Sequence, residues 1–370
     1  MEIETKIHEY YMQLALDEAK KGKSMTKLNP MVGAIIVKDN QIISRGYHKK
    51  YKGDHAEVDA IKNSKVNLEN STMYVTLEPC SHYGNTPPCV DKIIENKISK
   101  VVIASLDPNP IVDGNGVKKL VENNIEVITG ILDDENQKLN EVFMKYIKTR
   151  EPFIIMKSAM SLDGKICTNI GESKWISCEK SREHTHNLRG DVSAIMVGIN
   201  TVIKDNPKLT CRVENKDNPI KIIVDSNLKI PMDSYIVEDA KNNKTIIVTT
   251  NNSDNQKIKL LEELNIEIMI VNKKDSRVDL KDMVKKLGQS NINSILLEGG
   301  STLNFSALKE GIVDKVMFYI APKIIGGSGK NSCVSGDGIK KLDDCIDIDN
   351  LTYTQIDKDI LIQGYTNKRR

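Results

Sequence analysis

The sequence predicts two consecutive α/β domains, and three observations support this fold class. At 370 residues, the chain is about twice as long as an ordinary single domain. Short apolar segments typical of strands alternate with segments whose apolar residues recur at helical spacing. The alternation runs to about residue 148 and restarts at about residue 152, because Pro152 disfavours helix at the residue before it. We therefore expect domains over residues 1–148 and 152–370.

The first half begins with a predicted helix and a predicted hairpin. Apolar residues at helical spacing predict a helix over residues 7–20, which Gly22 ends. Apolar segments at 32–37 and 41–44 flank Lys38-Asp39-Asn40, a pattern typical of a β-hairpin. The elements expected next are a short helix from His55, a strand at 73–77, a helix at 89–96, a strand at 101–105, a helix at 117–122, a strand at 126–129 and a helix at 133–148. This order predicts a layered domain whose far side is largely parallel.

The second half repeats the alternation of strands and helices. Strands are expected at 153–156, 194–197, 220–224, 245–248, 267–271 and 294–297, and helices at 181–189, 258–264, 280–287 and after Gly300. The polar stretches 213–218 and 250–255 are interpreted as loops. We find no internal repeat and no low-complexity tract.

Composition and charge exclude several classes of protein. Lys plus Arg number 53 and Asp plus Glu number 51, so a net charge of +2 gives no field typical of a DNA-coating or membrane-surface protein. No segment approaches the roughly 20 apolar residues that a membrane span needs. The N-terminus lacks the pattern of a secretory signal. Seven scattered cysteines, an odd number, favour reduced thiols over a disulfide scaffold, and we expect a cytoplasmic protein.

The strongest chemical signal is His55-Ala56-Glu57, followed by Pro79-Cys80 and then Cys89. A catalytic zinc ion typically takes three protein ligands and keeps its fourth position for water, whose pKa it lowers to about 7. One histidine and two thiolates meet that need, and Glu57 would move the proton from the water to a leaving nitrogen. The arrangement is typical of zinc nucleobase deaminases, although eight residues, rather than two, separate the cysteines.

Three other interpretations of these residues stay open. Cys80 and Cys89 could be unrelated buried thiols, or they could form a disulfide, which a reducing compartment disfavours. His82 could also supply a fourth ligand and close a structural zinc site. Such a site has no use for Glu57, which favours catalysis.

The chain resembles a known family at several motifs in order. They are Asn29-Pro30-Met31-Val32-Gly33, Gly46-Tyr47-His48, His55-Ala56-Glu57, Pro79-Cys80-Ser81-His82, Thr86-Pro87-Pro88-Cys89 and Asp107-Pro108-Asn109-Pro110. Together they resemble the deaminase half of the bifunctional deaminase–reductase of riboflavin biosynthesis. The resemblance implies a cytidine-deaminase-like α/β/α fold and hydrolytic removal of the 2-amino group from a phosphoribosylated diaminopyrimidinone. It implies one zinc ion on His55, Cys80 and Cys89, Glu57 as proton shuttle, and a substrate pocket lined by Asn29, His48, His82 and Asn109.

One position departs from the family pattern. Members of the family commonly carry a basic residue before Thr-Pro-Pro-Cys, where it can meet the substrate phosphate, and this chain has Asn85. An amide can bond a phosphate but brings no charge. Phosphate affinity is therefore expected to be weaker, unless Lys49, Lys50 or Lys52 compensates.

The second half lacks the G-x-G-x-x-G pattern of a Rossmann domain. It has Glu298-Gly299-Gly300 between a strand and a helix, where glycines let the backbone approach a phosphate. Alone this signal is weak, because paired glycines often form only a turn. Further motifs are Lys157-Ser158-Ala159-Met160-Ser161-Leu162-Asp163-Gly164-Lys165, Gly171-Glu172-Ser173-Lys174-Trp175, Leu188-Arg189, Val197-Gly198-Ile199-Asn200-Thr201 and Asp205-Asn206-Pro207-Lys208-Leu209-Thr210-Cys211-Arg212.

These motifs are similar to the reductase half of the same family, which has a dihydrofolate-reductase-like fold. The resemblance implies hydride transfer from NADPH to the first ribose carbon of the deaminated product, giving 5-amino-6-(5-phosphoribitylamino)uracil. It implies substrate contacts at Ser173, Arg189, Leu209, Arg212 and Glu298. It implies cofactor contacts at Ala159, Trp175, Thr201, Asp205, Ser226, Gly300, Ser301, Thr302, Leu303, Asn304, Phe305 and Ser306. Relatives of the reductase fold also lead us to expect a homo-oligomer.

Alternatives remain for single residues and for the whole chain. An alternative interpretation of Trp175 is an ordinary core aromatic. The alternative for Arg189 and Arg212 is that they are solvated surface charges. Lys157 and Asp163 are placed near the chemistry without a defined role. For the whole chain, the rivals are an RNA or free-nucleobase deaminase with an accessory domain, and a non-catalytic zinc-stabilised binding protein. The near-neutral charge does not favour an RNA-binding surface.

Overall fold

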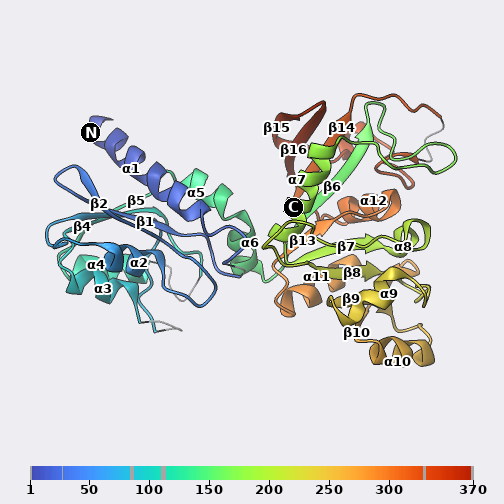
Figure 1. Cartoon of the computed structure of the whole chain (residues 1–370), viewed down its shortest axis with the longest axis horizontal. Coiled ribbons are helices and arrows are strands. Elements are labelled where there is room, and N and C mark those ends of the chain that lie inside the picture. The colour runs from blue at the N-terminus through green and yellow to red at the C-terminus, as the bar shows by residue number, and fades with distance from the viewer. Residues whose placement is uncertain (1, 27, 84–86, 110–113, 328–330, 368–370) are drawn as a thin grey trace. The chain divides into compact units, whose positions relative to one another are not determined.

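The computed structural model describes residues 2–26, 28–83, 87–109, 114–327 and 331–367 (Figure 1). The chain divides into two compact units, Met1–Thr149 and Arg150–Arg370. None of the described helices combines the length and the apolar character that crossing a bilayer needs.

The first unit is a five-stranded sheet with helices on both faces (Figure 1). Its elements are α1 (Glu2–Lys20), β1 (Gly33–Lys38), β2 (Gln41–Tyr47), α2 (Ala56–Asn63), β3 (Thr72–Leu77), α3 (Cys89–Glu95), β4 (Lys100–Ser105), α4 (Asn115–Glu122), β5 (Glu126–Thr129), α5 (Asp133–Leu139) and α6 (Glu141–Thr149). The strand order is β2-β1-β3-β4-β5. β1 is antiparallel to β2 and β3, whereas β3, β4 and β5 are parallel.

Alternating residues of the strands build two apolar cores in this unit. Ala34 and Ile36 face the core that α2, α3 and α4 cover. Ile35 and Val37 face the core that α1 covers. Because side chains alternate between the two faces of a strand, an apolar run such as residues 33–37 fits a strand buried on both sides. Because α2 and α3 cover the same face of the sheet, His55 at the start of α2 and Cys89 at the start of α3 lie on the same side of the sheet.

The second unit is built on a sheet of nine described strands, in the order β10-β9-β8-β7-β13-β6-β14-β16-β15. The strands are β6 (Phe153–Ser161), β7 (Ala194–Gly198), β8 (Ile220–Val224), β9 (Thr245–Thr250), β10 (Ile266–Val271), β13 (Ser294–Leu297), β14 (Lys315–Ala321), β15 (Ile348–Ile356) and β16 (Asp359–Thr366). The run from β10 to β14 is parallel, and β16 and β15 add to it in antiparallel fashion.

Helices cover this sheet on both faces. They are α7 (Glu179–Asp191), α8 (Ile199–Asp205), α9 (Tyr235–Glu238), α10 (Asn255–Glu263), α11 (Leu280–Gln289) and α12 (Ser301–Lys309). Short pieces complete the unit: η1 (Asp239–Lys241), η3 (Leu342–Asp344), β11 (Lys273–Lys274) and β12 (Arg277–Val278). α11 and α12 pack on one core, and α8, α9 and α10 pack on the other.

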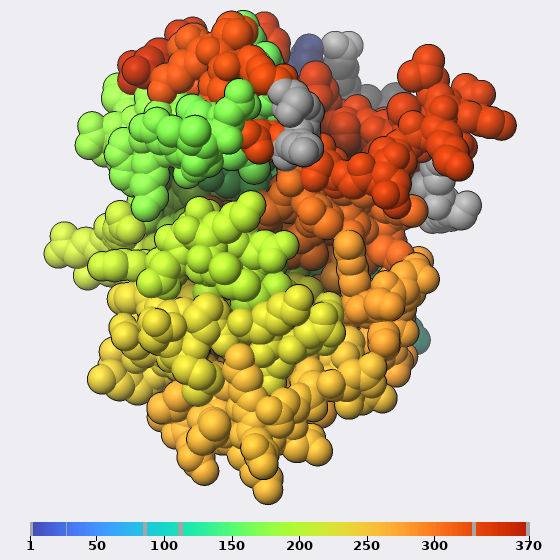
Figure 2. Space-filling model, turned by 90° about the vertical axis from the view of Figure 1, so that its right-hand side faces the viewer, coloured from blue at the N-terminus to red at the C-terminus, as the bar shows by residue number. Residues whose placement is uncertain are grey.

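Distant segments of the second unit meet at the ends of its strands. α8 follows β7 directly and α12 follows β13 after three residues, so both helices begin at the carboxyl edge of the sheet. In Figure 2, green segments near residues 160–180 lie beside orange-to-red segments beyond residue 310. Hydrogen bonds join them, from Ile325 N and Gly326 N to the Asp163 carboxylate at 3.1 and 2.7 Å. At the N-terminus of α7, Asp359 of β16 accepts bonds from Cys178 N and Ser181 Oγ, both at 2.7 Å.

The structure corrects two expectations about elements. The helix expected over 133–148 is two helices, because Asn140 leaves the helical conformation and its side chain bonds Met31 N at 2.8 Å and Met31 O at 3.0 Å. The sequence pattern also missed α8, α9 and the strands β14, β15 and β16. The expected hairpin is confirmed, with Asp39 and Asn40 at positive φ between β1 and β2. The first helix starts at Glu2 rather than at residue 7.

Candidate active sites

Three ligand-type side chains meet at one edge of the first sheet. His55 precedes α2, Cys80 follows β3, and Cys89 is the first residue of α3. Their donor atoms all lie within 4.8 Å of one another, with His55 Nδ1 3.5 Å from Cys80 Sγ and 3.2 Å from Cys89 Sγ. A tetrahedral zinc ion with bonds of about 2.0–2.3 Å holds its ligand atoms roughly 3.5–3.8 Å apart, so these residues fit that ion.

The contacts of Cys80, Cys89 and His82 distinguish between the alternative interpretations of these residues. Cys80 and Cys89 are free thiols in contact with one histidine, so they are neither unrelated nor disulfide-bonded. Among the described residues, His55, Cys80 and Cys89 form the only such group, and the exposed His82 lies outside it. The structure thus supports a three-residue ligand set rather than a closed four-residue one.

The electrostatics of the trio favour a thiolate at Cys80. Hydrogen bonds from Cys89 and His55 lower the pKa of Cys80, and the shared proton raises the pKa of Cys89. The Cys89 backbone N–H also donates to Cys80 Sγ at 3.4 Å, which supports a thiolate there. The hydrogen bond to Cys80 raises the pKa of His55 to about 9. A bound metal ion would displace these protons, because thiolate and neutral imidazole are the ligand forms.

Glu57 lies in the first turn of α2, two residues after His55, and is only 3% exposed. Burial raises the pKa of its carboxyl to about 7. A carboxyl group that gains and loses a proton near neutral pH suits proton transfer. Glu57 is not a member of the ligand group, as the sequence analysis expected.

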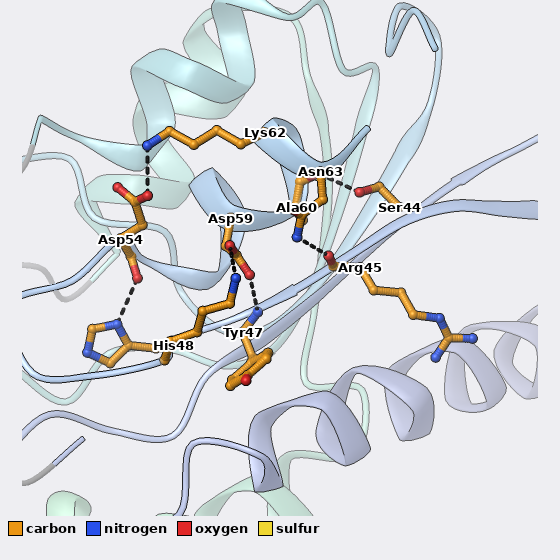
Figure 3. Close-up of polar contacts among 10 residues, drawn as sticks. Ser44, Arg45, Tyr47, His48, Asp54, Asp59, Ala60, Lys62 and Asn63 are labelled. Carbon is orange, nitrogen blue, oxygen red and sulfur yellow. Dashed lines mark hydrogen bonds and ion pairs between the residues drawn. The ribbon is translucent and has the colours of Figure 1, made fainter. Parts of the chain in front are cut away.

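His48 forms a hydrogen-bonded pair with Asn29 and is also bonded to Asp54, and Figure 3 shows the contact with Asp54. His48 Nδ1 donates to the Asp54 carbonyl at 2.9 Å, and burial lowers the pKa of His48. The neutral ring therefore has an unprotonated Nε2, which accepts from Asn29 Nδ2 at 3.0 Å. The His48 and His55 rings lie edge to face, 5.7 Å apart. Asn29 thus keeps its side-chain oxygen as the group available to a substrate.

The remaining residues expected in this pocket have different surroundings. Asn109 is half-buried, and its backbone N–H donates to Asp107 Oδ1 at 2.9 Å. Lys49 pairs with Asp59 at 2.7 Å, whereas Lys50 and Lys52 are exposed. Asn85 lies outside the described residues. The sequence analysis missed Glu78, a buried carboxylate next to Cys80, although an acidic residue directly after an apolar strand is a visible signal.

In the second unit, Glu298, Arg189 and Lys157 come together from three elements. Arg189 donates Nε to Glu298 Oε1 at 2.7 Å and Nη2 to Oε2 at 2.9 Å, and Lys157 Nζ lies 3.8 Å from the same carboxylate. Burial favours the neutral acid, but the Arg189 and Lys157 charges outweigh it and lower the pKa of Glu298 to about 2. Burial lowers the pKa of Lys157. Arg189 is therefore not a solvated surface charge.

The other expected substrate positions, and the expected cofactor position Trp175, divide between surface and core. Trp175 is 61% exposed and stacks under the Arg182 guanidinium at 4.6 Å, so the core interpretation of Trp175 is wrong. Arg212 is exposed, and its charge together with that of Arg189 acts on His186. Leu209 packs in the core and is 4% exposed. Ser173 is half-buried.

Two of the expected cofactor positions, Thr201 and Gly300, lie close together near the carboxyl ends of β7 and β13. Gly300 is the N-cap of α12, and a Cβ on it would lie 3.4 Å from Thr201 Oγ1. Ser301 Oγ accepts from Ser335 Oγ at 2.8 Å, and Asn304 Nδ2 donates to the Cys333 carbonyl at 3.0 Å. Glycines beside free helix amides leave room for a phosphate group, so these residues fit a nucleotide cofactor.

The other positions of that set vary in exposure and placement. Ala159 lies on β6 and Asp205 ends α8, while Ser226 Oγ, just beyond β8, accepts from Val278 N at 3.0 Å. Within α12, Thr302 is exposed, and Leu303, Phe305 and Ser306 are half-buried.

Comparisons with known proteins agree with both sites. Residues 152–362 match the RibD C-terminal domain, and residues 5–105 match the cytidine and deoxycytidylate deaminase zinc-binding region. The chain is 45% identical to the riboflavin biosynthesis protein RibD of Actinobacillus pleuropneumoniae, over 95% of this chain and 93% of that protein. It is 40% identical to RibD of Aquifex aeolicus, over 96% and 98% of the two chains.

The chain belongs to the RibD family. Among solved structures, Acinetobacter baumannii RibD is similar with a TM-score of 0.87 and 34% identity, over 98% of this chain and 100% of that one. The deaminase/reductase of Thermotoga maritima gives a TM-score of 0.84 and 35% identity, over the same shares. Membership of the RibD family confirms the resemblance and the fold class drawn from the sequence. The chain is a bifunctional deaminase and reductase of riboflavin biosynthesis that uses zinc and NADPH.

Proposed function

We propose that the first domain, residues 1–148, deaminates 2,5-diamino-6-(5-phosphoribosylamino)pyrimidin-4(3H)-one. The second, residues 152–370, then reduces the ribosyl group with NADPH to give 5-amino-6-(5-phosphoribitylamino)uracil. The observation that carries the first step is the His55, Cys80 and Cys89 group beside the buried Glu57. The solved relative from Thermotoga maritima is named for both activities.

In the first site, His55, Cys80 and Cys89 would hold zinc, which supplies a water molecule acidic enough to lose a proton at neutral pH. Glu57 takes one proton from the water and delivers it to the amino nitrogen, which leaves as ammonia. The oxygen of the water remains on the pyrimidine carbon as a carbonyl, and the second proton of the water ends on the adjacent ring nitrogen. Asn29, fixed by His48, accepts a hydrogen bond from the ring or its amino group, and His82 and Asn109 complete the pocket.

In the second site, NADPH supplies the hydride that the ribose carbon accepts. Gly300 to Ser306, Ala159, Trp175, Thr201, Asp205 and Ser226 hold the cofactor in this proposal. Arg212 faces the substrate phosphate, because a guanidinium can bond two phosphate oxygens at once. Arg189, which bonds Glu298 through Nε and Nη2 and the Thr210 carbonyl through Nη1, offers the phosphate its remaining N–H groups. Glu298 accepts two hydrogen bonds from Arg189 and so holds the guanidinium group in one orientation. Ser173 and the backbone at Leu209 complete the substrate contacts.

The test replaces Glu57 and follows the two reactions separately. Glu57→Gln should keep about one zinc ion per chain and lose ammonia release by roughly 10²–10⁴-fold, because the amide cannot carry the proton. NADPH oxidation with predeaminated substrate should be unchanged. The exposed Glu122→Gln variant is the matched control. Ammonia release by Glu57→Gln at the wild-type rate would refute the assignment, and loss of zinc would instead indicate that Glu57 helps to hold the ion.

We further propose a cytoplasmic enzyme that binds small molecules, with no nucleic acid and no membrane partner, and that forms a homo-oligomer. β15 supports the last part, because it is the final strand in the order of described strands. Leu351 and Tyr353 on it are 60% and 79% exposed. An open edge strand offers unpaired backbone groups to a second copy.

A further inference from the structure

Glu78 lies between β3 and the zinc-ligand position Cys80, and its side chain is buried, with 4% of the residue exposed. Four backbone N–H groups donate to its carboxylate. They are Gly116 N and Val117 N to Oε1, at 2.9 and 3.2 Å, and Asp107 N and Gly114 N to Oε2, at 3.2 and 3.1 Å. A carboxylate has about four acceptor positions, so this one is fully used.

The four donors come from the two ends of one segment. Asp107 stands just after β4, while Gly114 is the N-cap of α4 and Gly116 and Val117 are in its first turn. The contact at the α4 end is close, because a Cβ on Gly116 would lie 2.1 Å from the Pro79 carbonyl oxygen. Glu78 thus fixes both ends of segment 107–117 against the strand end that carries Cys80.

One further hydrogen bond connects Asp107, which is bonded to Glu78, with Asn109, a residue expected in the substrate pocket of the first site. Asp107 Oδ1 accepts from the Asn109 backbone N–H at 2.9 Å, so the turn at Asp107 sets the position of Asn109. Asn109 is the pocket residue of this segment. Asn109 is therefore connected to the strand end that carries Cys80 through two hydrogen bonds, from Asn109 N to Asp107 and from Asp107 N to the Glu78 carboxylate.

We propose that Glu78 is a positioning residue for the deaminase reaction, which sets Asn109 relative to the metal ligands. This inference rests on the proposed function of the first domain. A glutamine has the same shape, but its amide N–H₂ would face two of the four backbone donors. Glu78→Gln should therefore lose two of the four bonds, either those from Gly116 and Val117 or those from Asp107 and Gly114, and the segment is then held less firmly.

The test measures deamination kinetics, zinc content and thermal unfolding of the full chain. Glu78→Gln should raise KM for the diaminopyrimidinone phosphate about tenfold, which corresponds to about 1.4 kcal/mol, with a smaller change in kcat. Zinc should stay at the wild-type level, and NADPH oxidation with predeaminated substrate should be unchanged. Glu18→Gln is the matched control, because Glu18 is a buried carboxylate of the same unit that contacts Arg45 and Lys21 instead.

A second variant and a second background separate positioning from stability. Asp107→Ala removes the turn that holds Asn109 without touching Glu78, and it should reproduce the rise in KM even if Glu78→Gln fails to fold. In an Asn109→Ala background, Glu78→Gln should add little to KM, because both changes act through one residue. An unchanged KM in Glu78→Gln and Asp107→Ala, or fully additive effects with Asn109→Ala, would overturn the proposal. Absence of ammonia release by the wild-type chain would instead refute the proposed function.

Discussion

Glu57 is buried and Glu298 is half-buried, and their environments move the pKa values of their carboxyl groups in opposite directions. Burial raises the pKa of Glu57 to about 7, whereas the charges of Arg189 and Lys157 outweigh burial and lower the pKa of Glu298 to about 2. Glu57 is therefore suited to transferring a proton, and Glu298 to staying charged and holding a cation. The difference between a proton carrier and an anchor lies in the neighbouring side chains.

Replacing Glu298 tests its role as an anchor. Glu298→Gln should lower the rate of NADPH oxidation at least about tenfold, because a buried Arg189 loses its charged two-point partner. Ammonia release should be unchanged. The measurement is NADPH absorbance with predeaminated substrate, with Glu183→Gln on the exposed face of α7 as the control. Equal oxidation rates in both variants would show that Glu298 has no part in the reduction.

Residue types at fixed spacing made the first site predictable. His55, Glu57, Cys80 and Cys89 were identified because zinc chemistry demands those side chains in that order. Leu209 shows the limit of such reasoning, because its exposure depends on packing against residues far away in the sequence. Trp175 is the reverse case: a large aromatic side chain usually favours the core, but this one lies exposed against Arg182.

At the scale of elements, helix α2 carries His55 at its N-cap and Glu57 in its first turn, so its distance from the sheet sets the metal geometry. Gly46 on β2 allows the close approach. A Cβ at Gly46 would lie 2.2 Å from Ala60 N and 2.5 Å from Ala56 O, both in α2. Ser44 and Asn63 bond the same two elements together in Figure 3.

Gly46→Ala should therefore push α2 away from β2. We expect the free energy of unfolding to fall by about 1–3 kcal/mol, and zinc content to drop below one per chain. Denaturant unfolding and elemental analysis measure the two effects. Gly53→Ala is the milder control, because its Cβ would meet Lys50 O at 3.0 Å. Full zinc occupancy with unchanged stability in Gly46→Ala would contradict this account of the packing.

Strand and helix patterns predicted most of the parallel strands of the second sheet but not the antiparallel strands β16 and β15 at its edge. Buried strands such as β7, and β13 after its first residue, are continuous apolar runs, which are visible in a sequence. β15 has exposed side chains along nearly its whole length, so it carries no apolar signal. The break at Asn140 was hidden because it depends on a contact with Met31, 109 residues away.

At the scale of the whole molecule, the two activities reside in units that each have their own cores. Single substitutions should therefore remove one reaction and spare the other, as expected for Glu57→Gln and Glu298→Gln. Assembly of copies is a separate property, and β15 is the surface we assign to it.

Tyr353→Lys should weaken that assembly, because a charge on an open edge strand disfavours pairing with a second copy. Sedimentation of the wild-type chain should show an oligomer, and the variant should shift toward a smaller mass at the same concentration. Asn252→Lys, in the exposed loop after β9, provides the control. An identical mass for Tyr353→Lys and wild type would move the interface elsewhere.

The bond from Asp359 to the start of α7 also has a consequence for how the protein is made. Residue 359 leaves the ribosome some 180 residues after Cys178 and Ser181. Until then, the N-terminus of α7, the helix that carries Arg189, lacks the carboxylate that accepts its hydrogen bonds. A nascent chain that stops before residue 359 therefore cannot complete the folded reductase domain. A chain that stops before residue 359 should therefore lack NADPH oxidation, although Asp359 itself need not touch a substrate.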